Sequence, residues 1–331
     1  MPTQIEEIAK QVATVKRQTK SEPRSGISLS DSEEIRNFPT TDQISEALHE
    51  NGFIKVEGCF SRKFVEAIKA DVEAHRFYLN RNGLTGVYSD TQYYFVNLLA
   101  ASRTFVSFIT SQKLKNALTS YFPGGCRLKA LRYYETYGGH HMQWHTDNKT
   151  ARGFAEIPGL IFIFYCEDVV DGEFQYIRGS HKWSSERGFN DYSDEYITKN
   201  HGDEIVRFAG PAGTLVIYNT YGIHRAKPVK RRDYVRKSVF FQVDAAINDG
   251  ETIIVNPSLF DPSLFADQWL FKFLGFGAPS TYGVWPRTDI ADVPLRSLAS
   301  HIFNFIRRRP KRVVISLLPR GLKQKIKAKV R

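Results

Sequence analysis

The sequence predicts a mainly β protein with flanking helices, because strand-like runs and helix-like runs occupy different parts of the 331-residue chain. Short runs rich in β-branched and aromatic residues follow one another from Cys126 to Asp244, and Gly, Pro and Asp separate them. The chain is 42% hydrophobic, which is enough to build a core beneath such strands. Their spacing is typical of a sandwich or barrel. The five runs are RLKALRYYETY, GLIFIFYCED, GEFQYIRGS, GTLVIYNT and RKSVFFQVD.

Two helices are predicted before this region. Thr41 or Asp42 can cap the first helix, and Gly52 can end it. A short strand over residues 53–56 follows. Ser61 can cap the second helix, which has apolar residues at helical spacing, namely Phe64, Val65, Ile68 and Val72.

The remaining segments set the domain organisation. The apolar run NPSLFDPSLFADQWLFKFLGFG after Asp244 predicts helices packed on the sheet, whereas the polar residues 1–37 predict a flexible or loosely attached segment. No repeat or low-complexity linker is present. We therefore expect one domain over residues 38–290 with its β core at about 126–245, followed by a tail over residues 291–331.

Cysteine usage and hydropathy indicate a cellular location. Cys59, Cys126 and Cys166 are odd in number and form no C-x-x-C pair, so neither a disulfide framework nor a zinc knuckle is indicated. The N-terminus has no secretory signal pattern, and no run reaches the roughly 18 apolar residues of a spanning helix. We expect a cytoplasmic protein, either soluble or on a membrane surface.

The net charge of +11 lies in the tail. Residues 307–331 contain eleven Lys or Arg and no acid, and the 35 basic residues that remain equal the 35 acidic ones. Such a segment beside an amphipathic helix can lie on an anionic membrane, where each basic residue contributes about 1 kcal/mol. Docking on an acidic protein and nonspecific nucleic-acid binding are alternatives. The interleaved apolar residues favour the membrane. The apolar face comprises Leu295, Leu298, Ile302, Phe305 and Ile306.

A metal site is indicated by the pentapeptide Gln-Trp-His-Thr-Asp at residues 143–147. In an extended chain, His145 and Asp147 project from the same side and can bind one ion together. His224, which follows the run GTLVIYNT, can supply a third ligand. Two imidazoles and one carboxylate are typical of Fe(II) that activates O2, because three coordination positions stay open.

Arg236 extends this site. It begins the apolar strand RKSVFFQVD, where a buried guanidinium needs an anion and can hold a carboxylate through two hydrogen bonds. A dicarboxylate held there at one end could chelate the iron with the other, as 2-oxoglutarate would. The residues thus predict an oxygenase that uses Fe(II), 2-oxoglutarate and O2 to oxidise an unactivated C–H bond.

Over residues 40–245, the sequence resembles the phytanoyl-CoA dioxygenase-like branch of the 2-oxoglutarate oxygenases. The matching pieces, in order, are WHTD, EDVVDGEFQYIRGSH, GTLVIYNT, GIHRAKP and RKSVFFQ. The resemblance implies a double-stranded β-helix, or cupin-like jelly roll. It implies iron ligands at His145, Asp147 and His224, and 2-oxoglutarate contacts at Arg236 and Tyr134. A carboxylate at residue 147 further implies hydroxylation or a related C–H oxidation, because halogenating relatives have a small residue there. Substrates in this branch are small molecules and lipid-linked compounds.

Two neighbours of the motif are candidate substrate contacts. His141 and His145 have the spacing of a helical zinc pair, but Gly138 and Gly139 argue against a helix, so we interpret His141 as a pocket residue. Trp144 can line the same pocket or pack in the core. The alternative function is a non-catalytic cupin-like binding protein at an anionic membrane surface, which would not need all four of the ligand and anchor residues.

Overall fold

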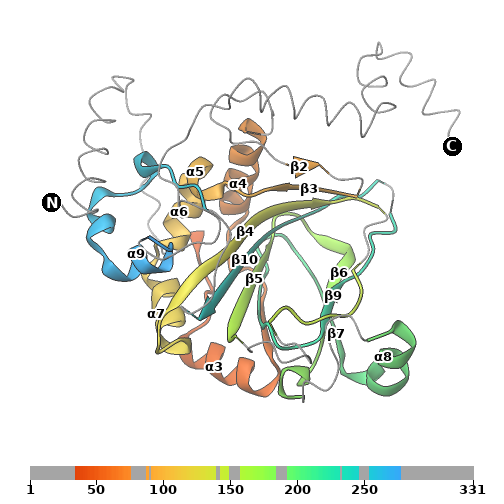
Figure 1. The fold of residues 1–331 in the computed structure, drawn as a ribbon. Coiled ribbons are helices and arrows are strands. Elements are labelled where there is room, and N and C mark those ends of the chain that lie inside the picture. Colours follow the sequence, from red (N-terminus) through yellow and green to blue (C-terminus); the bar gives the residue numbers. More distant parts are fainter. Residues whose placement is uncertain are drawn as a thin grey trace, which may run out of the picture.

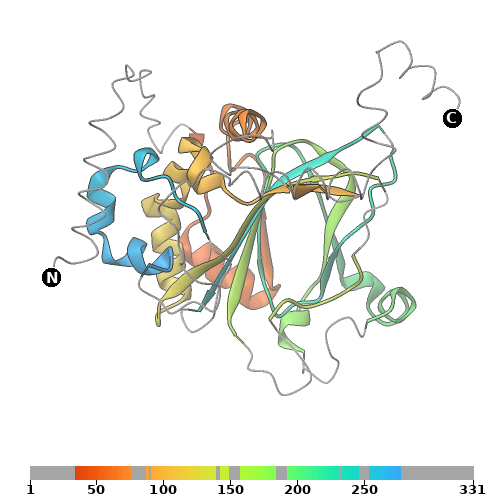
Figure 2. The ribbon, with the colours of Figure 1, turned by 45° about the horizontal axis from the view of Figure 1, so that its top comes forward.

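In the computed structural model, two antiparallel sheets face each other, and helices cover the outer face of the larger one (Figures 1 and 2). This architecture confirms the predicted fold class of a mainly β protein with flanking helices. The structure describes residues 34–75, 87–88, 91–138, 142–148, 157–183, 192–231, 233–245 and 253–276.

The larger sheet has the strand order β1-β8-β5-β10-β4-β3-β2, and the smaller has the order β7-β6-β9. All five predicted runs form strands, namely β4, β5, β6, β8 and β10. The strands of the larger sheet are β1 (Phe53–Val56), β2 (Val87–Tyr88), β3 (Gln92–Phe95), β4 (Cys126–Thr136), β5 (Gly159–Tyr165), β8 (Leu215–Asn219) and β10 (Arg236–Ala245). Those of the smaller sheet are β6 (Val169–Ile177), β7 (Ile205–Gly210) and β9 (His224–Ala226).

Most helices lie on the side of the larger sheet that faces away from the smaller one, whereas α8 lies beside the smaller sheet (Figures 1 and 2). The aromatic segment after the sheet forms α9 and short 3-10 helices, as predicted. The helices are α3 (Thr41–Glu50), α4 (Arg62–Ala74), α5 (Leu98–Ala101), α6 (Arg103–Ile109), α7 (Gln112–Tyr121), α8 (Asp194–His201) and α9 (Gln268–Phe273). The 3-10 helices are η1 (Ser180–Lys182), η2 (Gly202–Glu204), η3 (Pro257–Leu259) and η4 (Pro262–Ala266).

Helices α3 and α4 begin at polar caps, and the cap of α3 differs from the prediction. Thr40, not Thr41 or Asp42, caps α3, because its hydroxyl accepts from the amide of Gln43 while the Gln43 side chain accepts from the amide of Thr40. Gly52 follows this helix at a φ of 86°, as a glycine at a helix end does. Ser61 caps α4 as predicted.

The two faces of the larger sheet have different partners, and β10 shows this. Val239, Phe241 and Val243 belong to the apolar core beneath the helices, whereas Arg236 and Phe240 line a cavity between the sheets. The strand alternation therefore places the side chains of Arg236 and Phe240 between the two sheets, in what we call the barrel interior.

Both ends of the chain lie outside the described residues, and so do the predicted N-terminal segment up to residue 33 and the predicted basic tail. Within the described residues, no helix combines the length and the apolar character needed to cross a bilayer.

Candidate metal centre

The two candidate histidine ligands face each other across one pair of backbone hydrogen bonds. His145 donates its amide to the carbonyl of His224 at 3.0 Å, and His224 donates back at 2.9 Å. Residues paired in this way in an antiparallel ladder project from the same face. The two imidazole centroids are accordingly 4.3 Å apart. This bridge places His145 beside β9 at the edge of the smaller sheet, while Trp144 pairs with Tyr192.

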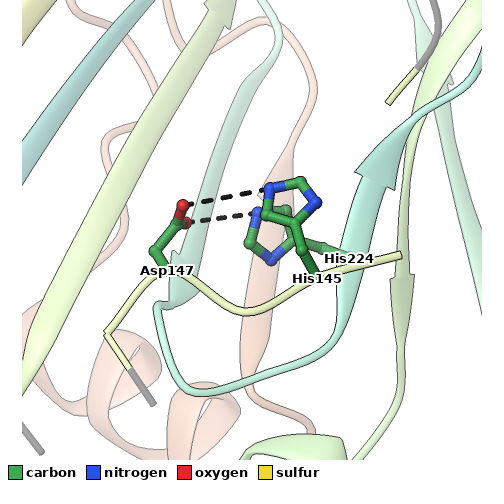
Figure 3. Close-up of side chains that lie close together, drawn as sticks. All are labelled: His145, Asp147 and His224. Carbon is green, nitrogen blue, oxygen red and sulfur yellow. Dashed lines mark ion pairs between the residues drawn. The ribbon is translucent and has the colours of Figure 1, made fainter. Parts of the chain in front are cut away.

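Asp147 completes the group, and Figure 3 shows its carboxylate pointing at both imidazoles. Its Oδ2 lies 3.2 Å from Nε2 of His224, and its Oδ1 lies 3.9 Å from Nε2 of His145. One ligand atom from each of the three residues falls within 4.8 Å of the others. The sequence predicts that these three residues lie together, and the structure places them together.

The tautomers of both histidines suit a metal. Nδ1 of His145 lies 2.7 Å from the carbonyl of Gln143, and Nδ1 of His224 lies 3.0 Å from that of Gly222. A carbonyl only accepts, so each Nδ1 carries the proton and each Nε2 presents a lone pair toward Asp147. Tyr218 can donate its hydroxyl toward Nε2 of His224 at 3.4 Å.

The pKa shifts of His145 and Asp147 also favour metal binding. Burial, with some help from His224, lowers the pKa of His145 to about 4, so this imidazole is neutral at pH 7. Burial by itself would raise the pKa of Asp147, but His224, His145 and Lys129 together bring it below its usual value. Oδ2 of Asp147 is buried and has no hydrogen bond. Two lone pairs and a buried anionic oxygen facing one point are the donor set of a divalent cation, so the residues fit iron.

A cavity of about 350 Å³ opens beside the three residues, a size in the range of small-molecule sites. Arg236 reaches it from β10 while buried to 8% exposure, and its guanidinium donates to the carbonyl of Gly172 and to Oγ1 of Thr136. No carboxylate of the described residues forms an ion pair with it. The cavity is lined by Gln92, Arg132, Tyr134, Met142, His145, Asp147, Ile163, Tyr165, Phe174, Tyr218, His224, Ala226, Arg236, Ser238 and Phe240.

Tyr134, the other predicted 2-oxoglutarate contact, lines the cavity and accepts a hydrogen bond from Arg132 at 2.9 Å. The sequence analysis missed Arg132 and Ser238. The signal for both was strand alternation, because Arg132 lies two residues before Tyr134 on β4, and Ser238 lies two residues after Arg236 on β10.

The two predicted substrate contacts have different outcomes. His141 lies outside the described residues. Trp144 is fully buried and does not line the cavity, because neighbouring residues in an extended chain point to opposite faces and His145 takes the inner one. Its indole donates to Asp194 at 2.9 Å, and the guanidinium of Arg225 lies 4.3 Å from its ring centroid. Trp144 therefore packs between the smaller sheet and α8.

Two facing sheets, a cluster of two histidines and one aspartate, and a buried arginine across the same cavity define the class of non-haem iron oxygenases of jelly-roll fold. The sequence profile described as Phytanoyl-CoA dioxygenase (PhyH) matches residues 48–237, which is more than half of the chain. The chain belongs to this family. Its cofactor and co-substrates are accordingly Fe(II), 2-oxoglutarate and O2.

One solved structure shares this fold, and two others were aligned at lower scores. HygX from Streptomyces hygroscopicus with nickel and 2-oxoglutarate bound aligns with a TM-score of 0.51 at 16% identity, covering 66% of this chain and 91% of HygX. HygX with nickel, 2-oxoglutarate and hygromycin B bound aligns at 0.48 and 15% identity, with the same coverage. The non-haem α-ketoglutarate-dependent carbocyclase SnoK from nogalamycin biosynthesis aligns at 0.48 and 16% identity, covering 63% of this chain and 87% of SnoK. A search of the curated proteins found no match.

Proposed function

We propose that this protein hydroxylates an unactivated C–H bond of a small organic molecule, lipid or lipid-linked compound, and that His145, Asp147 and His224 hold its iron. The observation that carries the proposal is the placement of these three ligand atoms and the buried Arg236 around one cavity. A simple binding protein has no need of a metal site and an anion anchor that face the same space.

Each residue has a defined task in this proposal. The two Nε2 atoms and the Asp147 carboxylate hold Fe(II) on one face, and Arg236 holds the distal carboxylate of 2-oxoglutarate through its guanidinium. The hydroxyl of Tyr134 lies on the same wall and can donate to that carboxylate. When bound, iron with 2-oxoglutarate and O2 supplies the oxidant for the C–H bond and releases succinate and CO2.

The walls of the cavity shape what it can accept. Phe174, Phe240 and Ile163 are apolar and exclude water from the reacting centre. Met142 lines the same cavity and is 37% exposed, so we place the substrate entrance beside it. Because Asp147 occupies the third ligand position, a halide has no place on the iron, which supports hydroxylation.

The test is an anaerobic titration of the purified chain with Fe(II) and 2-oxoglutarate. We expect a weak charge-transfer band in the visible region, lost in Asp147→Ala at the iron concentration that saturates the wild type. Admitting O2 should bleach the band and release succinate. A wild-type protein without the band would instead favour the cupin-like binding protein.

We further propose that the basic tail holds the enzyme on the cytoplasmic face of a membrane. The support is its eleven Lys or Arg without an acid, next to apolar residues at helical spacing. Removing residues 295–331 should release the protein from liposomes of anionic lipid and leave its iron affinity unchanged. Equal binding of the full and shortened chains to these liposomes would contradict the proposal.

A further inference from the structure

A β-bulge in β4 places a lysine inside the barrel. On β10, Gln242 pairs with Ala130 and Val243 pairs with Leu128, so Lys129 has no residue opposite it. Residues on either side of the bulge keep their apolar side chains in the core beneath the helices, as Leu128 and Leu131 show. The extra residue absorbs the shift in alternation and turns its side chain to the inner face.

There, Lys129 joins a compact polar cluster that centres on Asn148. Its ammonium lies 2.9 Å from Oδ2 of Asp244 and donates to Oδ1 of Asn148 at 3.1 Å. The Asn148 amide donates to Oδ1 of Asp244 at 2.9 Å. Gln242 donates to the same oxygen at 2.9 Å and to Asn148 at 3.3 Å. Both ends of the Asn148 amide are thus fixed.

The cluster is closely packed as well as hydrogen-bonded. Asp244 is fully buried, and Asn148 is 8% exposed. A Cβ at Gly159 would overlap Oδ1 of Asp244 and lie 2.6 Å from Nδ2 of Asn148, so this position has room only for glycine. Because the polar groups of this cluster are buried, hydrogen-bonded and tightly packed, the cluster holds the Asn148 side chain in a single conformation.

Asn148 directly follows Asp147, the candidate carboxylate ligand. On its other side, Asp147 is tied down by its own amide, which donates to the carbonyl of Thr220 at 3.1 Å. The carboxylate itself receives no hydrogen bond at its buried Oδ2, so its direction depends on the backbone that carries it. The anchor for that backbone is the neighbouring Asn148 side chain.

We propose that Asn148, held by Asp244, Gln242 and the bulged Lys129, is a positioning residue that aims the Asp147 carboxylate at the metal. This inference rests on the proposed function, because it assigns Asp147 to the metal. Such outer contacts are worth about 10- to 100-fold in metal affinity.

The experiment measures Co(II) binding to the full chain by its visible d–d absorption, which reports both affinity and coordination geometry. Asn148→Ala should weaken Co(II) about 10-fold or more and change the shape of the spectrum. Asn256→Ala is the matched control, because Asn256 anchors its own turn at η3 through its side chain and should leave both unchanged. Gln242→Met is a second variant in case Asn148→Ala does not fold. It keeps the side-chain volume and removes one hydrogen bond to Asn148, so it should also weaken Co(II) binding.

A double-variant comparison separates aiming from general loosening. In the Asp147→Ala background, adding Asn148→Ala should change Co(II) affinity less than about 2-fold, because the group it positions is gone. Equal losses in both backgrounds, or wild-type affinity and spectrum in folded Asn148→Ala and Gln242→Met, would overturn the inference alone. A wild-type chain that binds no Co(II) would overturn the proposed function and this inference with it.

Discussion

The side chains of His145, Asp147 and His224 converge at one point. Most of this geometry follows from the alternation and pairing of residues in β-strands. His145 and Asp147 share a side because strand residues alternate, which the sequence shows directly. The sequence predicts His224 as the third ligand because it follows a strand. In the structure, reciprocal backbone hydrogen bonds place His224 opposite His145. The roles of Lys129 and Asn148 could not be predicted, since a bulge leaves no clear mark in one sequence.

Arg236→Ala is the first prediction at this scale. It should weaken 2-oxoglutarate by about 2 kcal/mol or more, roughly 30-fold, because it removes a desolvated cation from its anion. Iron affinity should stay at the wild-type value, since the guanidinium is a hydrogen-bond donor to Gly172 and Thr136 and is not one of the proposed iron ligands. Calorimetric titration with Fe(II) present measures both. Arg207→Ala removes an exposed arginine of β7 as a control, and an unchanged affinity for 2-oxoglutarate in Arg236→Ala would mean that the anion binds elsewhere.

At the scale of elements, the five long strands were predictable because apolar and β-branched residues mark them. Two of the strands that were missed, β7 and β9, carry little signal. β9 has three residues, and β7 is an edge strand in which Phe208 alone is buried. The docking of α8 was also hidden, because it depends on Arg225, which bonds Gln175 at 2.8 Å and pairs with Asp194 while covering Trp144. This contact supports the outer side of the strand pair that carries both histidines.

Trp144→Phe tests that contact. The variant keeps an aromatic ring but loses the hydrogen bond to Asp194 and part of the attraction to Arg225, so it should lower the free energy of unfolding by about 1–2 kcal/mol. Urea unfolding measures the loss. Trp269→Phe in α9, where the indole stacks on Phe273, should cost less. A Trp144→Phe protein of full stability with altered turnover of 2-oxoglutarate would restore Trp144 to the substrate pocket.

On the scale of the whole molecule, one apolar core between the larger sheet and the helices holds the three cysteines as ordinary small hydrophobes. This agrees with the absence of a disulfide pattern in the sequence. Burial raises the pKa of Cys59 and of Cys126 to about 12, and it raises that of Cys166 as well. Little thiolate exists at neutral pH, so the thiols have no ready chemistry in the folded state.

Two outcomes follow for the folded protein. At pH 8, a thiol reagent should label the native chain slowly and the guanidinium-unfolded chain at all three cysteines. The unfolded thiols ionise near pH 9 and the folded ones much higher, so their contribution to stability is complete below about pH 9 and falls as the pH rises toward 12. Denaturant midpoints across this range measure the decline. Rapid labelling of the native chain would show that the core is open at a cysteine.

The reciprocal bonds between His145 and His224 have a consequence for how the enzyme is made. The metal-binding half-site at residues 145–147 leaves the ribosome well before its partner strand, and it stays incomplete until β9 docks beside it. If these residues hold the iron, we expect tight iron binding only after β9 has paired with His145, because the three proposed ligands converge only then. The rate of metal binding during refolding should therefore not exceed the rate at which β9 pairs with His145.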